Sequence, residues 1–249
     1  MNGPVFLAAP VGPAPAATGS GAPWSLLCDR DGTVIENRSD YVRAPAHIRF
    51  LPGAIRALLR ATEAGVPIVL VTNQSPIGRG LLSLRDVVNL HRLATDALFD
   101  EGVRIAGTYL CPHAPADRCG CRKPEPGMVR AAMDHFGFDR SRTALVGDSV
   151  DDVLAARRAG VRGVMVRTGR GARHAPQLAA LPEAAGTPVV ADLAAAVERL
   201  CQLHPTAGGP RATAEADRAH ATDQTDATSA LRPETRGADW LFSIRSGGR

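Results

Sequence analysis

The sequence predicts a three-layer α/β fold in which a parallel sheet carries helices on both faces. Two observations lead to this prediction. Short apolar runs alternate with helical patterns over residues 24–204, in a repeated strand–helix–strand order. Three of these runs end at polar residues, Asp29, Thr72 and Asp148. Right-handed crossovers bring the carboxyl ends of parallel strands to one edge, so these side chains should converge there.

Each element follows from a local pattern. Apolar runs that stop at turn or polar residues predict strands over 24–28, 67–71, 105–110, 144–146, 163–166 and 188–190. Between them, helices are predicted over 53–64, 83–101, 127–136 and 151–159, with a last one from Asp192. Ser83 is a suitable N-cap and Gly137 a suitable helix stop. The pattern has no internal repeat.

The 249 residues predict one domain, over 24–204, with two tails. Residues 1–23 are rich in Pro and Gly, carry no charge and lack the basic start of a secretory signal, so we expect a disordered extension. Residues 205–249 hold too few apolar side chains over most of their length to offset chain entropy, so we expect a mostly disordered tail.

Composition also limits partners and location. No apolar run reaches the ~18–20 residues that a bilayer crossing needs, so no membrane span is expected. The net charge of +4 is too thin and scattered to argue for nucleic acid. We expect a monomer in the cytoplasm. Of 29 basic residues, 28 are arginine, and Lys123 is the one lysine, which singles it out because the two side chains are not interchangeable in a tight site.

Four polar motifs follow predicted strands or loops. Asp29 and Asp31, in Asp-Arg-Asp-Gly-Thr, provide two carboxylates, one able to attack and one able to shuttle a proton. Thr72 and Asn73 end a second strand, where a hydroxyl and backbone amides can bind phosphate oxygens. Lys123 could neutralise a phosphoryl group and a nucleophile.

The fourth motif, Gly147-Asp148-Ser149-Val150-Asp151-Asp152, places a carboxylate after a strand with further acids one turn on. Hard oxygen ligands of this kind favour Mg²⁺, which needs only one or two carboxylates and substrate phosphate.

Three cysteines and a histidine lie within eleven residues of one loop. Cys111, His113, Cys119 and Cys121 provide three thiolates and one imidazole, a set that suits tetrahedral, structural Zn²⁺. Because Arg122 and Lys123 directly follow the last of them, a bound zinc would fix the loop that carries the lysine. Cys28 and Cys201 fall on predicted elements and are interpreted as core or incidental residues.

Together, in this order, the four motifs resemble the haloacid dehalogenase superfamily of phosphatases, over residues 24–170. The resemblance implies a Rossmann-like haloacid dehalogenase fold. It also implies Asp29 as the nucleophile, Asp31 as the general acid and base, and Thr72 with Lys123 as the phosphate-binding pair. Mg²⁺ would bind Asp29, Asp148 and the backbone carbonyl of Asp31, with Asp152 as an outer acid of the same motif.

The segments between the motifs leave no room for the cap domain that many members carry. A cap-less chain with this cysteine loop resembles the subfamily of D-glycero-D-manno-heptose 1,7-bisphosphate 7-phosphatases and histidinol phosphatases. The stretches that match are Arg-Lys-Pro-Glu-Pro-Gly-Met from Arg122 and Thr-Asn-Gln-Ser-Pro-Ile-Gly-Arg-Gly from Thr72. The resemblance places Arg122 among the substrate contacts. Pro76 and Asp40 depart from the usual glycines in loops that border the substrate.

The leading hypothesis is a Mg²⁺-dependent phosphatase that removes the 7-phosphate of heptose 1,7-bisphosphate, a small phosphorylated sugar. Two alternatives stay open. Histidinol phosphate would use the same chemistry, although Arg43, Arg79 and Arg122 suit a cationic substrate less well. A catalytically inactive, zinc-stabilised binding domain would belong to another class, but the presence of every motif carboxylate and of Lys123 disfavours it.

Overall fold

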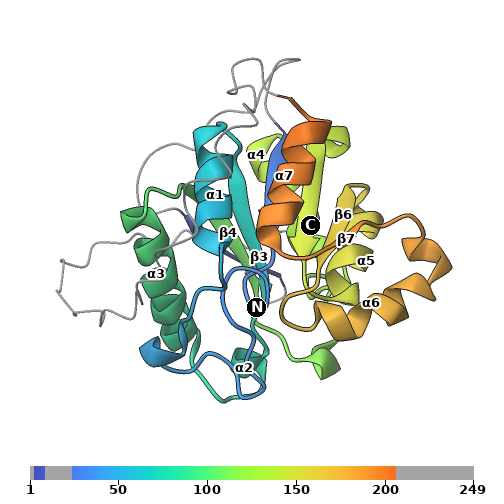
Figure 1. Ribbon diagram of the computed structural model, residues 1–249. Coiled ribbons are helices and arrows are strands. Elements are labelled where there is room, and N and C mark those ends of the chain that lie inside the picture. The colour runs from blue at the N-terminus through green and yellow to red at the C-terminus, as the bar shows by residue number, and fades with distance from the viewer. Residues whose placement is uncertain (1–2, 9–23, 206–249) are drawn as a thin grey trace.

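A seven-stranded sheet forms the centre of the computed structural model, which describes residues 3–8 and 24–205 (Figure 1). The strand order is β1-β4-β3-β2-β5-β6-β7. The strands are β1 (Val5–Ala8), β2 (Ser25–Cys28), β3 (Ile68–Asn73), β4 (Ile105–Cys111), β5 (Thr143–Gly147), β6 (Arg162–Val166) and β7 (Val189–Val190). Every pair within the described sheet is parallel except β1 with β4.

Seven α-helices accompany the described strands, and several begin or end where the sequence signals them. They are α1 (Ala54–Glu63), α2 (Ser75–Gly78), α3 (Leu84–Asp100), α4 (Gly127–Phe136), α5 (Val150–Ala159), α6 (Gly171–Ala179) and α7 (Leu193–Leu203). Ser83 caps α3 in a reciprocal capping box with Asp86. Gly137 ends α4 in the left-handed conformation. Helices α2 and α6 were not predicted.

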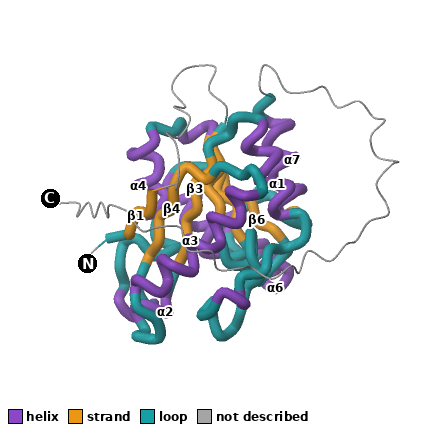
Figure 2. The backbone as a smooth tube through the Cα atoms, turned by 90° about the vertical axis from the view of Figure 1, so that its left-hand side faces the viewer, coloured by secondary structure: helices purple, strands orange, loops and turns teal. Residues whose placement is uncertain are grey.

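The strands divide the core into two layers because alternate side chains point to opposite faces. Leu26, Ile68 and Val146 pack with residues of α1, α3 and α7. Leu27 and Val69 lie on the other face, against α4 and α5. Figure 2, turned by 90°, shows α4 on one side of the sheet and α1 with α7 on the other. The predicted three-layer α/β fold is confirmed.

The N-terminal residues differ from the expectation. Val5–Ala8 form β1, an antiparallel edge strand on β4, where a disordered segment was predicted (Figure 2). Phe6 explains the ordering, because its ring packs against Tyr109 and Phe136 and covers Gly107. The rest of the predicted N-terminal extension and nearly all of the predicted C-terminal tail lie outside the described residues.

No domain is inserted between β2 and β3, where the structure has only loops, a 3₁₀ turn and α1. Between β3 and β4 it has α2, α3 and short loops. The carboxyl ends of β2, β3 and β5 therefore open onto a pocket bordered by loops.

Within residues 3–8 and 24–205, no helix is long and apolar enough to cross a bilayer.

Candidate active site

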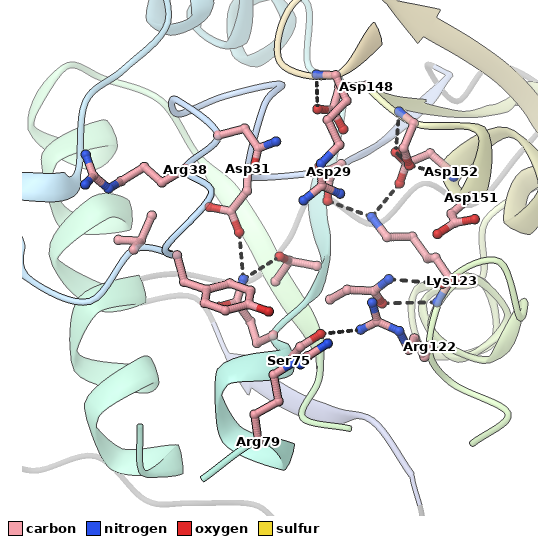
Figure 3. A pocket seen from close by; sticks show the side chains of 18 residues that line it. Asp29, Asp31, Arg38, Ser75, Arg79, Arg122, Lys123, Asp148, Asp151 and Asp152 are labelled. Carbon is pink, nitrogen blue, oxygen red and sulfur yellow. Dashed lines mark hydrogen bonds and ion pairs between the residues drawn. The ribbon is translucent and has the colours of Figure 1, made fainter. Parts of the chain in front are cut away.

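The pocket lies at the carboxyl ends of the central strands, where the parallel topology was expected to bring the motifs together. Asp29 follows β2, Thr72 lies near the end of β3 and Asp148 follows β5, and all three line the pocket. The Asp29 backbone amide donates to the carbonyl of Val146 at 2.9 Å, which fixes the start of the first motif against β5. Lys123 enters from the loop before α4 (Figure 3).

A buried lysine joins two carboxylates at the centre of the site. Lys123 Nζ lies 2.6 Å from Asp29 Oδ1 and 2.5 Å from Asp152 Oδ1 (Figure 3). It also donates to the carbonyl of Val71 at 2.7 Å. Burial favours the neutral amine, but the charges of Asp152 and Asp29 outweigh it and raise the pKa of Lys123. Lys123 is therefore a cation at neutral pH.

The nucleophile predicted from the sequence is desolvated. Burial raises the pKa of Asp29, and the charge of Lys123 opposes that rise. Asp152 uses its other oxygen, Oδ2, to accept hydrogen bonds from the amide and hydroxyl of Ser149, which caps α5. A single side chain thus connects the start of α5 to the lysine.

Three buried carboxylates, from Asp29, Asp148 and Asp152, have oxygens within 4.8 Å of one another. Burial, followed by the charge of Asp152, raises the pKa of Asp148 to about 6. Mutual repulsion among buried acids is what a bound cation relieves, and an all-oxygen donor set fits Mg²⁺. The residues present therefore fit the predicted metal.

A loop after β6 completes this side of the site and was not predicted. The Arg170 amide donates to Asp148 Oδ2 at 2.8 Å, and the Thr168 hydroxyl donates to the carbonyl of Gly32 at 2.7 Å. A Cβ on Gly169 would lie 2.2 Å from Asp148 Oδ2, so only glycine lets this loop approach. The one available signal was its place at the carboxyl end of another parallel strand.

Asp31 also lines the pocket, but its carboxylate is not part of the cluster of Asp29, Asp148 and Asp152. Its carboxylate is bound by the Arg30 guanidinium, with Nη2 at 3.0 Å from Oδ1 and 2.9 Å from Oδ2. Gln74 Nε2 donates to Asp31 Oδ2 at 2.8 Å and to Thr72 Oγ1 at 2.9 Å. The sequence predicted no role for Arg30 or Gln74, although Arg30 lies between Asp29 and Asp31 and Gln74 directly follows Asn73.

Thr72, Asn73 and Arg122 were predicted to bind substrate, and all three line the pocket. Asn73 holds Lys123 by its backbone, donating to its carbonyl at 3.0 Å and accepting from its amide at 3.1 Å. Arg122 Nη1 donates to Ser75 Oγ at 2.7 Å. Three further arginines, Arg38, Arg79 and Arg170, also line the pocket, and Arg38 forms an ion pair with Asp40. Cationic residues around the wall make the pocket suited to anions.

The predicted zinc ligands lie together. Cys121 Sγ is 3.4 Å from the sulfurs of Cys111 and Cys119 and 3.3 Å from His113 Nδ1. Cys111 Sγ is 3.6 Å from Cys119 Sγ and 3.5 Å from His113 Nδ1. The hydrogen bond from Cys121 lowers the pKa of Cys111 to about 5, which favours a thiolate. Tetrahedral Zn–S bonds of about 2.3 Å space sulfurs by under about 4 Å, so the cluster is compatible with zinc.

Comparisons with known proteins agree with this geometry. Residues 120–196 match the family model described as HAD-hydrolase-like. The D-glycero-beta-D-manno-heptose-1,7-bisphosphate 7-phosphatase of Pseudomonas aeruginosa is 37% identical over 177 residues, which are 71% of this chain and 97% of that protein. The D-glycero-alpha-D-manno-heptose-1,7-bisphosphate 7-phosphatase of Mycobacterium tuberculosis is 42% identical over 141 residues, 55% of this chain and 73% of that one.

A solved structure is similar in both fold and sequence. The D,D-heptose 1,7-bisphosphate phosphatase of B. bronchiseptica, crystallised with magnesium and phosphate, has a TM-score of 0.68 and 38% identity. The alignment covers 72% of this chain and 99% of that one. The fold, the motifs and these similarities lead to one conclusion: the chain belongs to the heptose bisphosphate phosphatase family of the haloacid dehalogenase superfamily.

Proposed function

We propose that this chain is a Mg²⁺-dependent phosphatase that removes the 7-phosphate of D-glycero-D-manno-heptose 1,7-bisphosphate through an aspartyl-phosphate. One observation carries the proposal, the buried Asp29–Lys123 ion pair beside Asp148 and Asp152. A carboxylate held against an ammonium can approach a phosphoryl group that would otherwise repel it. The names of the relatives support the choice of substrate.

In the first step, Asp29 attacks the phosphorus and the bond to the sugar oxygen breaks. Lys123 offsets negative charge on both the nucleophile and the phosphoryl group, and the hydroxyl of Thr72, which lines the pocket, would donate to a phosphoryl oxygen. Bound Mg²⁺, held by Asp29, Asp148 and the carbonyl of Asp31, would supply further positive charge. Asp31 protonates the leaving oxygen, then accepts a proton from the water that hydrolyses the aspartyl-phosphate.

The guanidinium groups of the pocket suit a second phosphate. Arg122 and Arg79 lie on the same side of the site as Ser75 and α2 (Figure 3). Guanidinium forks bind phosphate oxygens in pairs, so this side is suited to the 1-phosphate of the sugar. A cationic substrate such as histidinol phosphate would be repelled here.

We also propose that Zn²⁺ binds Cys111, His113, Cys119 and Cys121 as a closed structural site. Its contribution would be geometric, because the last ligand lies two residues before Lys123. The four protein ligands leave no open position for substrate, so zinc would take no part in the chemistry.

The test is phosphate release, with Mg²⁺ present, from both anomers of heptose 1,7-bisphosphate and from histidinol phosphate. We expect a large kcat/KM preference for one bisphosphate anomer. Asp29→Asn, which keeps the size of the side chain and removes the nucleophile, should fold and release no phosphate. Turnover by this variant would overturn the mechanism, and a preference for histidinol phosphate would overturn the substrate.

A further inference from the structure

We propose that Gln74 and Arg30 are positioning residues that hold the carboxyl group of Asp31 where the leaving oxygen departs. The inference rests on the proposed phosphomonoester hydrolysis, with Asp29 as nucleophile and Asp31 as general acid, and not on which sugar is used. It assigns Gln74 a part distinct from that of Asn73, its neighbour in the chain.

The Asp31 carboxylate is held from the side away from the solvent. Its side chain is 24% exposed, whereas that of Arg30 is 3% exposed. Arg30 reaches both carboxylate oxygens, with Nε 3.2 Å from Oδ1 in addition to the two Nη2 contacts. A planar guanidinium that grips both oxygens fixes the plane of the carboxylate as well as its position. Asp31 itself lines the pocket.

Gln74, the residue between β3 and α2, binds the same carboxylate and is itself held at two points. Its side chain is buried, and its two amide hydrogens are used by Asp31 Oδ2 and Thr72 Oγ1. Its backbone amide donates to the carbonyl of Cys111 at 2.8 Å. Because the Thr72 hydroxyl accepts from Gln74, its own hydrogen is left to donate to a phosphoryl oxygen. Gln74 therefore connects Asp31 to Thr72, the group proposed to contact the phosphate.

Asn73 provides a matched comparison one residue away. Both oxygen and nitrogen of its side-chain amide bind the backbone of Lys123, and within residues 3–8 and 24–205 no hydrogen bond joins it to Asp31. Lys123 acts on the phosphoryl group and the nucleophile. Loss of the Asn73 amide should therefore weaken phosphoryl transfer by the same factor whatever the leaving group.

Gln74 and Asn73 act on different parts of the step that cleaves the P–O bond. As Asp29 forms its bond to phosphorus, the electron pair of the breaking P–O bond stays on the leaving oxygen, which takes its proton from Asp31. A good leaving group such as p-nitrophenolate departs without that proton, whereas a phenol or sugar oxygen needs it. Misplacing Asp31 should therefore slow poor leaving groups far more than good ones.

The experiment measures alcohol release in a single turnover with enzyme in excess. Its substrates are p-nitrophenyl phosphate, phenyl phosphate and heptose 1,7-bisphosphate. Gln74→Met keeps the side-chain length without a donor, and Arg30→Lys keeps the charge without the planar fork. Each should slow phenyl phosphate and heptose bisphosphate about 10- to 100-fold more than p-nitrophenyl phosphate, part of the ~10²–10⁴ that general acids provide.

Asn73→Ala should slow all three by one common factor. Equal slowing of all three substrates by both Gln74→Met and Arg30→Lys would overturn the inference while leaving the phosphatase activity in place. Folding is checked by circular dichroism, and either variant alone keeps the comparison decisive. A wild-type protein that turned over none of the three esters would instead overturn the proposed function, and the inference with it.

Discussion

Gly32 sets the geometry of the first motif at the residue scale. Its φ of +94° lies in the left-handed region, and a Cβ there would fall 2.0 Å from Asp148 Oδ2. Gly53 also has a positive φ, +74°, but a Cβ there would meet nothing within 4 Å. Substitution at Gly53 therefore introduces backbone strain alone, whereas substitution at Gly32 adds a collision with Asp148, a candidate metal ligand.

Replacing each glycine by alanine should therefore give unequal results. Gly53→Ala incurs only the cost of the left-handed backbone, about 1 kcal/mol. Gly32→Ala adds the displacement of Asp148, so we expect an unfolding free energy lower by about 1–3 kcal/mol and weaker activation by Mg²⁺. Urea unfolding and Mg²⁺ titration of phosphate release measure both. Equal losses of unfolding free energy and equal Mg²⁺ activation in the two variants would show that the collision with Asp148 affects neither stability nor metal binding.

At the element scale, a buried histidine joins α3 to β4. His91 Nε2 lies 2.9 Å from Thr108 Oγ1, and the side chain is buried. Burial, followed by the charge of Arg30, lowers the pKa of His91 to about 3. The folded protein keeps this imidazole neutral, whereas the unfolded chain protonates it near its usual pKa of about 6.5. Its contribution to stability is therefore full above pH 6.5 and is lost as the pH falls toward 3.

Substitution of His91 should remove that dependence. Between pH 7 and pH 5 the wild-type protein should lose about 2 kcal/mol through this residue, and His91→Gln should not. The measured quantity is the difference between the urea midpoints of the wild type and His91→Gln at each pH. The contribution of Asp148 is common to both proteins and cancels in this difference. Its raised pKa gives the metal-free protein the opposite trend, with stability lost as the pH rises through about 6. A difference that stays constant with pH would refute the assignment.

Elements with strong local patterns were predictable, and β1 was not. The central strands are apolar on both faces, which the sequence displays directly. Val5–Ala8 is only four residues, with Pro4 before it and Pro10 two residues after it, and its ordering depends on distant partners such as Gly107 and Phe136. The same distinction holds in the site. Asp29, Lys123 and Asp148 were found from their motifs, whereas the hold of Gln74 on Asp31 depends on packing across β2 and β3.

At the scale of the whole molecule, the cysteine cluster and the active site share one support. Cys111 ends β4 opposite Asn73, its carbonyl accepts from the Gln74 amide, and Cys121 is followed by Arg122 and Lys123. The cluster thus adjoins the segment that carries Asn73 and Gln74 and the segment that carries Arg122 and Lys123. Distortion of the cluster should therefore lower the activity without any change in the carboxylates that are proposed to bind Mg²⁺.

Removal of zinc should therefore abolish phosphate release, and excess Mg²⁺ should not restore it. Metal content by atomic spectroscopy and phosphate release are measured before chelation, after it, and after return of Zn²⁺, which should recover activity. Ser in place of Cys201, which lies on α7 outside the cluster, is the control and should retain metal and activity. Full activity of the zinc-free protein with Mg²⁺ would contradict the proposed zinc role.

Lys123 has a further consequence for the chemistry of the whole chain. It is the one lysine in 249 residues, and it is 3% exposed between two carboxylates. Reagents that acylate amines require a neutral, accessible nitrogen, so the folded molecule offers them no ε-amino group. Each acylated lysine would then mark a molecule in which Lys123 had left its ion pairs and reached solvent. A single added mass on this side chain would count those events, without any substrate being turned over.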